Sequence, residues 1–332
     1  MALANPSPNA DNDELERLRQ LNQKGVKIFS TDDVLMEGLK LLGWKEGRLK
    51  KRKSANTNID QYTGMYGVHP CVTAQLTEDL QTTEFDEARV EPKDLNLDKL
   101  HWTLNWLYRY PTETERESQW NKCANTVRDA NWLYTDKIRH LKREKIVWPK
   151  SFLPTDIWVM TVDGTHLVTL EPGDGDIPKD PSYFSFKHHA AGFNYEVGVS
   201  LFESKCIWLS GPHKAGEYND AKVFREKGLC DKLKQTGKKA IGDDGYRGFP
   251  NECSTANGLD CEAVKDFKSR ARQRHEIYNG KLKVFSVLSD TFRCKSHPKD
   301  PWTPAQKLQM VFEAVNVLVA YKMEKGEPLF DI

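Results

Sequence analysis

In several stretches of the first 150 positions, apolar residues recur every three to four residues, the spacing of helices that bury one face. The pattern is clearest in residues 96–145. It predicts one helix that ends before Pro111, a short acidic helix over Thr112–Trp120, and a longer helix capped by Asn125 or Thr126. The first half of the chain is therefore expected to be helical.

Residues 1–95 are less regular. A short helical pattern precedes Gly25, and Thr31–Trp44 predicts a helix capped by Thr31 or Asp32. Residues 54–95 show no clear period, so we expect irregular packing or a linker there. We interpret 1–95 as an N-terminal tail followed by a helical and irregular region.

After Pro149 the pattern changes to short runs rich in β-branched residues. Ile157–Asp163 predicts a strand, with His166–Leu170 as its candidate extension, and Tyr195–Phe202 with Lys205–Ser210 predicts a hairpin. Between them, Glu171–His189 has the Gly, Pro and Asp content of a long loop.

The last third alternates helix and strand signals. Asn219–Gln235 predicts a helix, Lys239–Asp243 a strand, and Ala271–Leu288 a helix, and Thr303 caps a final apolar helix. Three strands, a helix, another strand and further helices is the order of an RNase H-like α/β domain, a mixed sheet flanked by helices. We place this domain at 151–332.

Residues 96–150 allow two interpretations. A short helix, a tight connection and a longer basic helix are typical of a helix-turn-helix DNA-binding domain. A plain helical packing domain explains the pattern equally well, and the connection lacks a glycine. The cations that favour DNA binding are Arg128, Lys137, Arg139, Lys142 and Arg143.

A basic run covers residues 45–53. It begins with Lys45, and its nearly consecutive cations are Arg48, Lys50, Lys51, Arg52 and Lys53. Such a run is typical of a solvated loop, of a nuclear-import signal or of an arm that contacts phosphates, and all three interpretations stay open. We expect the protein to be nuclear.

Composition narrows the function classes. The 332 residues are 38% hydrophobic and carry a net charge of +1, as in a folded protein whose overall charge does not predict nucleic-acid binding. No apolar run approaches the roughly 18 residues that span a bilayer, so no membrane partner is expected. The seven cysteines lack zinc-ligand spacing.

Two aspartates follow predicted strands. Asp163 ends the strand at 157–163, and Asp243 ends the strand at 239–243. Open α/β sheets bind ligands at such strand ends. Asp244 is the alternative to Asp243, although alternation along a strand lets only one of the two face a site. Each motif alone is more typical of a turn.

Glu276 lies between two cations on one helical face. Arg272 precedes it by four residues and Lys283 follows it by seven, so all three share a stripe. A carboxylate flanked in this way suggests that an anion binds there. Together with Asp163 and Asp243 it forms a candidate trio of metal ligands.

Three carboxylates without cations would repel one another. Hard oxygen ligands favour Mg²⁺ or Mn²⁺, and two such ions support in-line displacement at a phosphodiester. In this interpretation Arg272 and Lys283 hold phosphate.

The region from about 151 to the C-terminus resembles DDE-superfamily transposases of the PIF/Harbinger type and their bacterial insertion-sequence relatives. The residues that carry the resemblance are Val162-Asp163-Gly164-Thr165, Phe186-Lys187-His188, Tyr195 to Val199, Ser210-Gly211-Pro212 with Ala215-Gly216, Asp220 before Val223-Phe224-Arg225, Asp243 to Tyr246, and Arg272 through Arg293. The relatives share a helix signature Y-x2-R-x3-E-x6-K. Arg272, Glu276 and Lys283 match it, whereas the tyrosine position is Ser269.

The resemblance implies a catalytic triad of Asp163, Asp243 and Glu276 that cuts transposon ends and joins them to target DNA. Asp220 matches a family position and is either a fourth, supporting metal ligand or simply a helix N-cap. Lys187 and His188 are either contacts to the DNA backbone or solvated loop residues. A homo-oligomer and a separate Myb-like partner protein are further expectations from the family.

Two other functions compete with a transposase. A phosphatase of the haloacid-dehalogenase type needs a nucleophilic aspartate two residues before Asp163, and that position is Thr161. A domesticated transposase that binds DNA without cutting it is the second alternative. The intact acidic trio argues against it, because unpaired carboxylates are costly to keep near a core.

Overall fold

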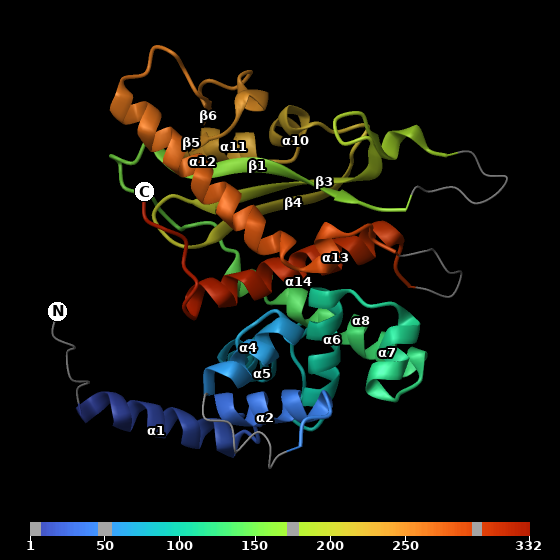
Figure 1. Ribbon diagram of the computed structural model, residues 1–332. Helices are drawn as coiled ribbons and strands as arrows, with labels where there is room; N and C mark the ends of the chain where they lie inside the picture. Colours follow the sequence, from blue (N-terminus) through green and yellow to red (C-terminus); the bar gives the residue numbers. More distant parts are fainter. Residues whose placement is uncertain (1–7, 46–54, 171–178, 294–300) are drawn as a thin grey trace.

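The computed structural model describes residues 8–45, 55–170, 179–293 and 301–332. Figure 1 shows helices of the first half on one side, a sheet flanked by helices on the other, and α14 (Pro304–Glu324) between them. Most of the basic run at 45–53 lies outside the described residues, as does the part of the expected loop at 171–178.

The first half forms α-helices. Their bounds are α1 Pro8–Gln23, α2 Thr31–Leu41, α4 Ala55–Tyr66, α5 Pro70–Thr82, α6 Leu97–Arg109, α7 Glu113–Trp120, α8 Ala124–His140 and α9 Lys142–Lys145. Two expected caps are wrong. Ser30 caps α2 in a reciprocal box with Asp33, and Cys123 occupies the cap position of α8.

The expectation of irregular structure at 54–95 is wrong for α4 and α5. The buried face of α5 carries Val72, Leu76 and Leu80 at four-residue spacing, but the buried faces of both helices also contain hydroxyl side chains, which weaken the apolar pattern in the sequence. The hydroxyl of Tyr62 donates to Thr73 at 3.0 Å, and the hydroxyl of Tyr66 donates to the Gly38 carbonyl at 2.7 Å. These bonds satisfy polar groups in a buried interface, which is why such residues pack as a core.

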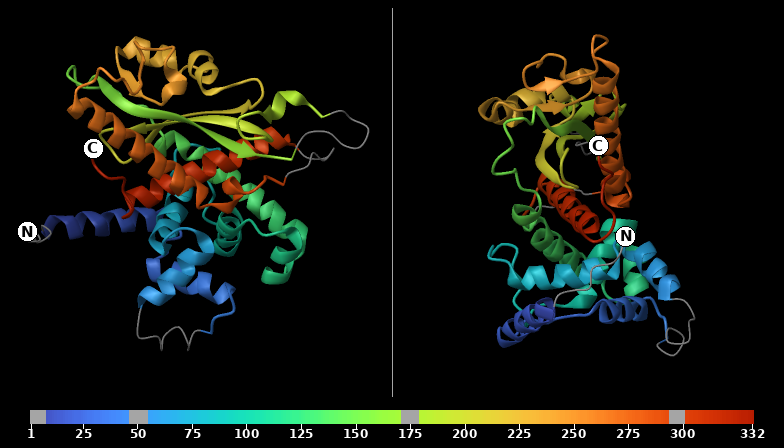
Figure 2. Two further views of the ribbon diagram at one scale, coloured as in Figure 1. Left: turned by 45° about the horizontal axis from the view of Figure 1, so that its top comes forward. Right: turned by 90° about the vertical axis from the view of Figure 1, so that its left-hand side faces the viewer.

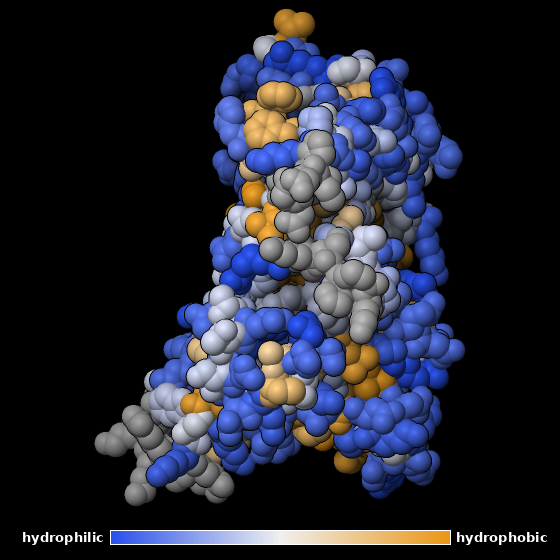
Figure 3. All heavy atoms as spheres, turned by 90° about the vertical axis from the view of Figure 1, so that its right-hand side faces the viewer, coloured by the Kyte–Doolittle hydropathy of each residue, from blue (hydrophilic) through white to orange (hydrophobic). Residues whose placement is uncertain are grey.

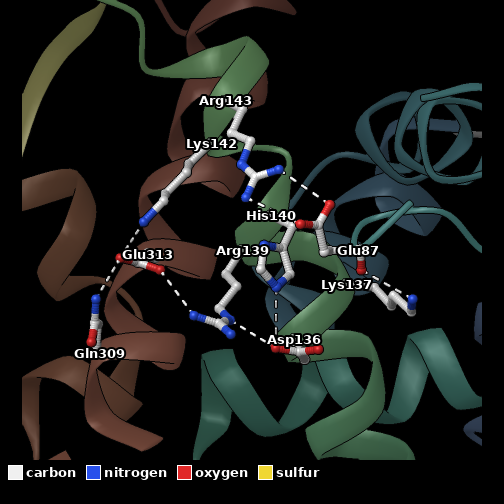
Figure 4. Close-up of polar contacts among 9 residues, drawn as sticks. All are labelled: Glu87, Asp136, Lys137, Arg139, His140, Lys142, Arg143, Gln309 and Glu313. Atoms are coloured by element: carbon white, nitrogen blue, oxygen red, sulfur yellow. Dashed lines mark hydrogen bonds and ion pairs between the residues drawn. The ribbon is translucent and has the colours of Figure 1, made fainter. Parts of the chain in front are cut away.

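The cations of α8 and α9 are bound within the chain (Figure 4). Lys142 Nζ lies 2.5 Å from Glu313 Oε1, and Arg143 pairs with Glu87 at 3.1 Å. The remaining pairs are Arg128 with Glu113, Arg139 with Asp136 and Glu313, and Lys137 with the Glu87 carbonyl. These side chains have structural partners, and DNA binding by a helix-turn-helix stays a prediction.

The sheet is mixed. Its strands are β1 Trp158–Val168, β2 Phe184–Ser185, β3 Ala190–Ser200, β4 Cys206–Lys214, β5 Lys239–Ile241 and β6 Cys253–Ser254. The main order is β4-β3-β1-β5-β6, and β2 pairs with the start of β3. β1 is antiparallel to β3 and parallel to β5. This architecture is compatible with an RNase H-like fold.

Helices cover both faces of the sheet (Figure 2). α10 (Asp220–Glu226) and α11 (Leu229–Thr236) pack on one face through Phe224 and Leu233. α12 (Glu262–Lys283) crosses the other face, where Ala271 contacts the core. The single helix expected at 219–235 is wrong, because Gly228 adopts φ +102 and separates α10 from α11.

The two halves share one hydrophobic core. α14 is buried along nearly its whole length, and the core continues from α6 and α8 through α14 to β3. The expected cap at Thr303 is confirmed by its bonding to Gln306. The boundaries near residues 95 and 150 stay predictions. No helix in the described ranges is long and apolar enough to cross a bilayer.

Candidate active site

Four carboxylates from separate segments gather beside β1. We call Asp163, Asp220, Asp243 and Glu276 the carboxylate cluster. Burial raises the pKa of Asp163 to about 6, and the negative charges of the other three add to that increase. An N–H bond from Gly164 to Asp163 Oδ1, at 2.8 Å, offsets part of it. Asp220, Asp243 and Glu276 are thus close enough to Asp163 for their charges to act on it.

The parallel pairing of β1 with β5 places the first two carboxylates. Thr161 on β1 lies opposite Ile241, the last residue of β5. Asp163 and Asp243 each come two residues later, so both emerge at the same edge. β5 ends earlier than the sequence predicts, and Asp243 caps a short 3₁₀ turn, accepting the Gly245 N–H at 2.8 Å.

Asp243 and Asp244 have different surroundings. Asp243 is half-buried and contributes to the pKa increase at Asp163. Asp244 is exposed and pairs with Arg247 at 2.8 Å. The geometry therefore favours Asp243 as the member of the cluster.

Asp220 lies against the backbone of β1. A Cβ added to Gly164 would be 2.1 Å from Asp220 Oδ1. Asn219 caps α10 by accepting the Lys222 N–H at 2.9 Å, so the interpretation of Asp220 as the N-cap is wrong. Burial raises the pKa of Asp220, Lys187 at 3.7 Å lowers it, and Asp243 raises it further.

Glu276 belongs to an exposed stripe of α12. Arg272, Glu276 and Lys283 are all exposed, as the sequence predicts, while Tyr278 and Leu282 on the opposite side are buried. In the described part of the chain neither Arg272 nor Lys283 has a hydrogen bond or ion pair to another side chain. Both cations are therefore available to an anionic ligand.

Three of the four predicted phosphate contacts meet at one edge of the cluster. His188 stacks on His166 with ring centroids 4.4 Å apart. Burial lowers the pKa of both histidines, and the positive charges of Lys187 and Lys283 lower it further. Lys187, His188 and Lys283 are thus neighbours.

Arg272 lies on the other side of Glu276, at a cleft. The cleft has a volume of about 630 Å³. Its polar lining includes Asn257, Lys265, Ser269, Arg272 and Gln273. Ser269, which replaces the tyrosine of the family signature, opens onto this space rather than filling it.

Sequence reasoning missed two buried polar groups behind the cluster. Glu196 on β3 accepts a bond from Trp208 Nε1 at 2.9 Å, and burial raises its pKa to about 8. Its Oε1 and the hydroxyl of Tyr246 lack hydrogen-bond partners among the described residues. The one available signal was a glutamate inside an otherwise apolar strand pattern.

The chemistry of the cluster suits a hard divalent cation. Carboxylate oxygens are ligands for Mg²⁺ or Mn²⁺, and the negative charges of Asp220, Asp243 and Glu276 add to the effect of burial in raising the pKa of Asp163. Among the described residues no three His, Cys, Asp or Glu side chains are arranged closely enough to hold an ion. The donor set fits such ions, whereas the side-chain positions do not form a closed site.

Thr161 occupies the position that a phosphatase nucleophile would need. It is buried, and its Oγ1 lies 2.8 Å from His275 Nδ1. This contact links β1 to α12. A buried threonine in this position cannot act as the aspartate nucleophile, so the structure argues against the phosphatase interpretation.

Comparison with protein families agrees with this site. Residues 162–319 match the family described as DDE superfamily endonuclease. The match includes the whole carboxylate cluster and both cations of the α12 stripe, and it supports a relationship with the DDE transposase superfamily. Comparisons with curated proteins and with solved structures gave no match.

Proposed function

We propose that this chain is a divalent-metal-dependent DNA endonuclease and transposase of the PIF/Harbinger type, which cuts phosphodiester bonds at transposon ends and transfers strands. The observation that carries the proposal is the meeting of four carboxylates from β1, α10, the end of β5 and α12. These segments lie far apart in the sequence, and the family match covers all of them.

Asp163, Asp243 and Glu276 are proposed as the catalytic ligands, with Asp220 in support. Bound Mg²⁺ or Mn²⁺, as two ions, would activate a water or 3′-hydroxyl and stabilise the leaving oxygen. Asp220 contacts the Gly164 backbone, so it also fixes the side of β1 on which the cluster forms.

The cations around the cluster would orient the DNA. Lys283, Lys187 and His188 lie at one edge, and Arg272 lies across Glu276 beside the cleft. A phosphate at the cluster would therefore have positive charge on both sides. Guanidinium and ammonium groups so placed hold phosphate oxygens and balance charge that develops during displacement.

The remaining parts of the proposal rest on the family resemblance. Nuclear localisation, a homo-oligomer and a separate Myb-like DNA-binding partner belong to it. The paired cations of α8 and α9 leave room for such a partner, because they reduce the positive charge that this helical part offers to DNA.

A cleavage assay tests the proposal. Purified full-length protein is incubated with Mg²⁺ and a duplex carrying the terminal inverted repeats that flank its gene, and nicks are mapped on a denaturing gel. We expect cutting by the wild type and by the matched control Asp244→Asn, but not by Asp163→Asn, Asp243→Asn or Glu276→Gln. Equal cutting by Glu276→Gln would refute the proposed triad.

The same assay distinguishes an active nuclease from the alternative, a domesticated transposase that binds DNA without cutting it. Specific binding of the terminal repeats without Mg²⁺- or Mn²⁺-dependent cutting would show a DNA-binding protein that has lost catalysis. Loss of cutting in the acidic variants with retained binding would show the opposite.

A further inference from the structure

A tight hairpin ends beside the carboxylate cluster. β2 pairs with the start of β3, with Phe184 opposite Ala191 and Ser185 opposite Ala190. The connection, Phe186–His189, is the hairpin tip. His189 adopts φ +51, and the His188 N–H donates to Ser185 Oγ at 3.3 Å. The tip is therefore a defined turn.

Two side chains attach the hairpin tip to the site. Lys187 Nζ lies 3.7 Å from an oxygen of Asp220. The His188 ring stacks on His166 at an interplanar angle of 8°, and His166 Nδ1 is 2.9 Å from Asn194 Oδ1. His166 follows Asp163 by three residues on β1. These contacts hold the tip against the carboxylate cluster.

Phe186 is left in solvent by this arrangement. Its exposed fraction is 83%, although the next two residues of the tip are anchored. The ring of Phe184 lies 5.4 Å away at 83° and supports it at one edge. The end of the molecule in Figure 3 is mostly hydrophilic, with apolar side chains in small separate patches. An uncovered phenyl ring on a turn that contacts the site is the kind of surface on which a planar ligand stacks.

We propose that Phe186 is a stacking platform for a nucleobase that leaves the DNA helix next to the phosphate at the carboxylate cluster. This proposal rests on the proposed function, since it takes DNA as the substrate. Lys187 is the next residue along the tip, and the positive charges of Lys187 and Lys283 act on the His188 ring of the same tip, so the backbone of an unpaired strand would meet positive charge there. Aromatic rings next to cations bind unpaired strands with little dependence on sequence, because every base has a stacking face.

Binding to forked and blunt DNA tests the platform. The probes are a fluorescein-labelled fork with an unpaired thymine tail and a blunt duplex of the same length, measured by anisotropy with full-length protein in EDTA. We expect Phe186→Ala to weaken fork binding roughly 5-fold or more, as loss of one stacked base would, and to leave duplex binding unchanged. Phe186→Trp should restore the preference for the fork.

Phe202 supplies the matched control. It is a phenylalanine with an exposed fraction of 53%, and it follows the opposite end of β3. Phe202→Ala should bind both probes as the wild type does. Equal binding of the fork by Phe186→Ala and wild type, or an equal loss for both probes, would overturn the proposal.

A second readout separates this proposal from catalysis. A 2-aminopurine placed at the first unpaired position should lose fluorescence on binding wild type and retain it with Phe186→Ala. Quenching by a protein that does not cut DNA would support the platform and count against the nuclease. Cutting without quenching would support the nuclease and count against the platform, and absence of binding to either probe would overturn the platform.

Discussion

Asp220 packs directly on the backbone of Gly164, so closely that a Cβ at position 164 would lie 2.1 Å from Asp220 Oδ1 and 2.8 Å from its Cγ. Gly164 follows Asp163 on β1, which sits between β3 and β5. The absence of a side chain at 164 therefore lets two carboxylates approach from different elements. This contact links the local sequence Asp163-Gly164 to the geometry of the whole cluster.

Gly164→Ala should displace Asp220 and lower DNA cleavage. The added methyl cannot be accommodated by the central strand, so α10 or the Asp220 side chain must shift. A displacement of about 1 Å at a catalytic group can lower the rate roughly 100-fold, and overpacking costs about 1–3 kcal/mol of stability. Cleavage rate and urea denaturation, measured together, separate the two effects.

Gly248→Ala is the control for this substitution. A Cβ at Gly248 would meet nothing within 4 Å. Its cleavage rate should equal that of the wild type. If Gly164→Ala also cleaves at the wild-type rate, Asp220 has no part in the active geometry.

Sequence patterns predicted the candidate trio because each residue stands in a recognisable local pattern. Asp163 and Asp243 come after apolar strand runs, and Glu276 shares a helical stripe with Arg272 and Lys283. Parallel pairing of β1 with β5 then brings two strand ends together. The predicted order of strands and helices thus indicated, without any side-chain detail, that Asp163, Asp243 and Glu276 would lie near one another.

Other features could not be predicted because their signal depends on tertiary contacts. Asp220 and Asn219 are equivalent as caps in sequence. The bond from the Lys222 N–H to Asn219 shows that Asn219 is the cap and that the Asp220 side chain has another place. α4 and α5 bury tyrosine and threonine beside apolar residues such as Val72 and Leu76, which weakens the apolar pattern of their helical faces. Glu196 looks like a surface residue until β3 is placed between β1 and β4.

Arg272 and Lys283 should contribute to DNA affinity through phosphate contacts. Each lacks a partner in the described part of the chain, so each can replace a condensed counterion on DNA. Arg272→Ala and Lys283→Ala are expected to weaken binding and to reduce the slope of log affinity against log salt by about 0.9 per lost contact. Anisotropy titrations at several salt concentrations measure that slope.

Lys142→Ala serves as the comparison for this experiment. It removes the same charge, but Lys142 is bound to Glu313 at 2.5 Å. We expect an unchanged salt slope. A reduced slope for Lys142→Ala, with none for Arg272→Ala, would place the DNA on the helical half of the molecule instead.

Glu313 should be more important for stability than Glu87, although both bind cations of α8 and α9 (Figure 4). The Glu313 side chain is 8% exposed and contacts Arg139, Lys142 and Gln309, whereas Glu87 is 53% exposed. Glu313→Ala leaves the partly buried Lys142 without its carboxylate and removes one of the two carboxylates beside Arg139, so it should cost about 1–3 kcal/mol. Glu87→Ala should cost clearly less than Glu313→Ala, because exposed ion pairs contribute little to stability.

Urea denaturation of the two variants measures this difference. The free energy of unfolding is compared at moderate salt, where exposed pairs are screened and buried ones are not. Equal losses for the two variants would mean that α14 is not held to α8 through Glu313.

Glu196 should make the protein less stable as pH rises from about 4.5 to about 8. Burial raises its pKa to about 8 in the folded chain, with Trp208 donating to it and Asp220 facing it, against an ordinary value of 4.5. Within this window the unfolded chain has released the proton that the folded chain retains. The free energy of unfolding therefore falls with increasing pH and levels off above the folded pKa. Gln keeps the Trp208 bond without a titrating proton, so Glu196→Gln should match the wild type near pH 4.5 and exceed its stability at pH 8. Urea denaturation in EDTA at pH 5, 6.5 and 8 tests this, and parallel pH profiles for the two proteins would show that Glu196 is ionised in the folded state.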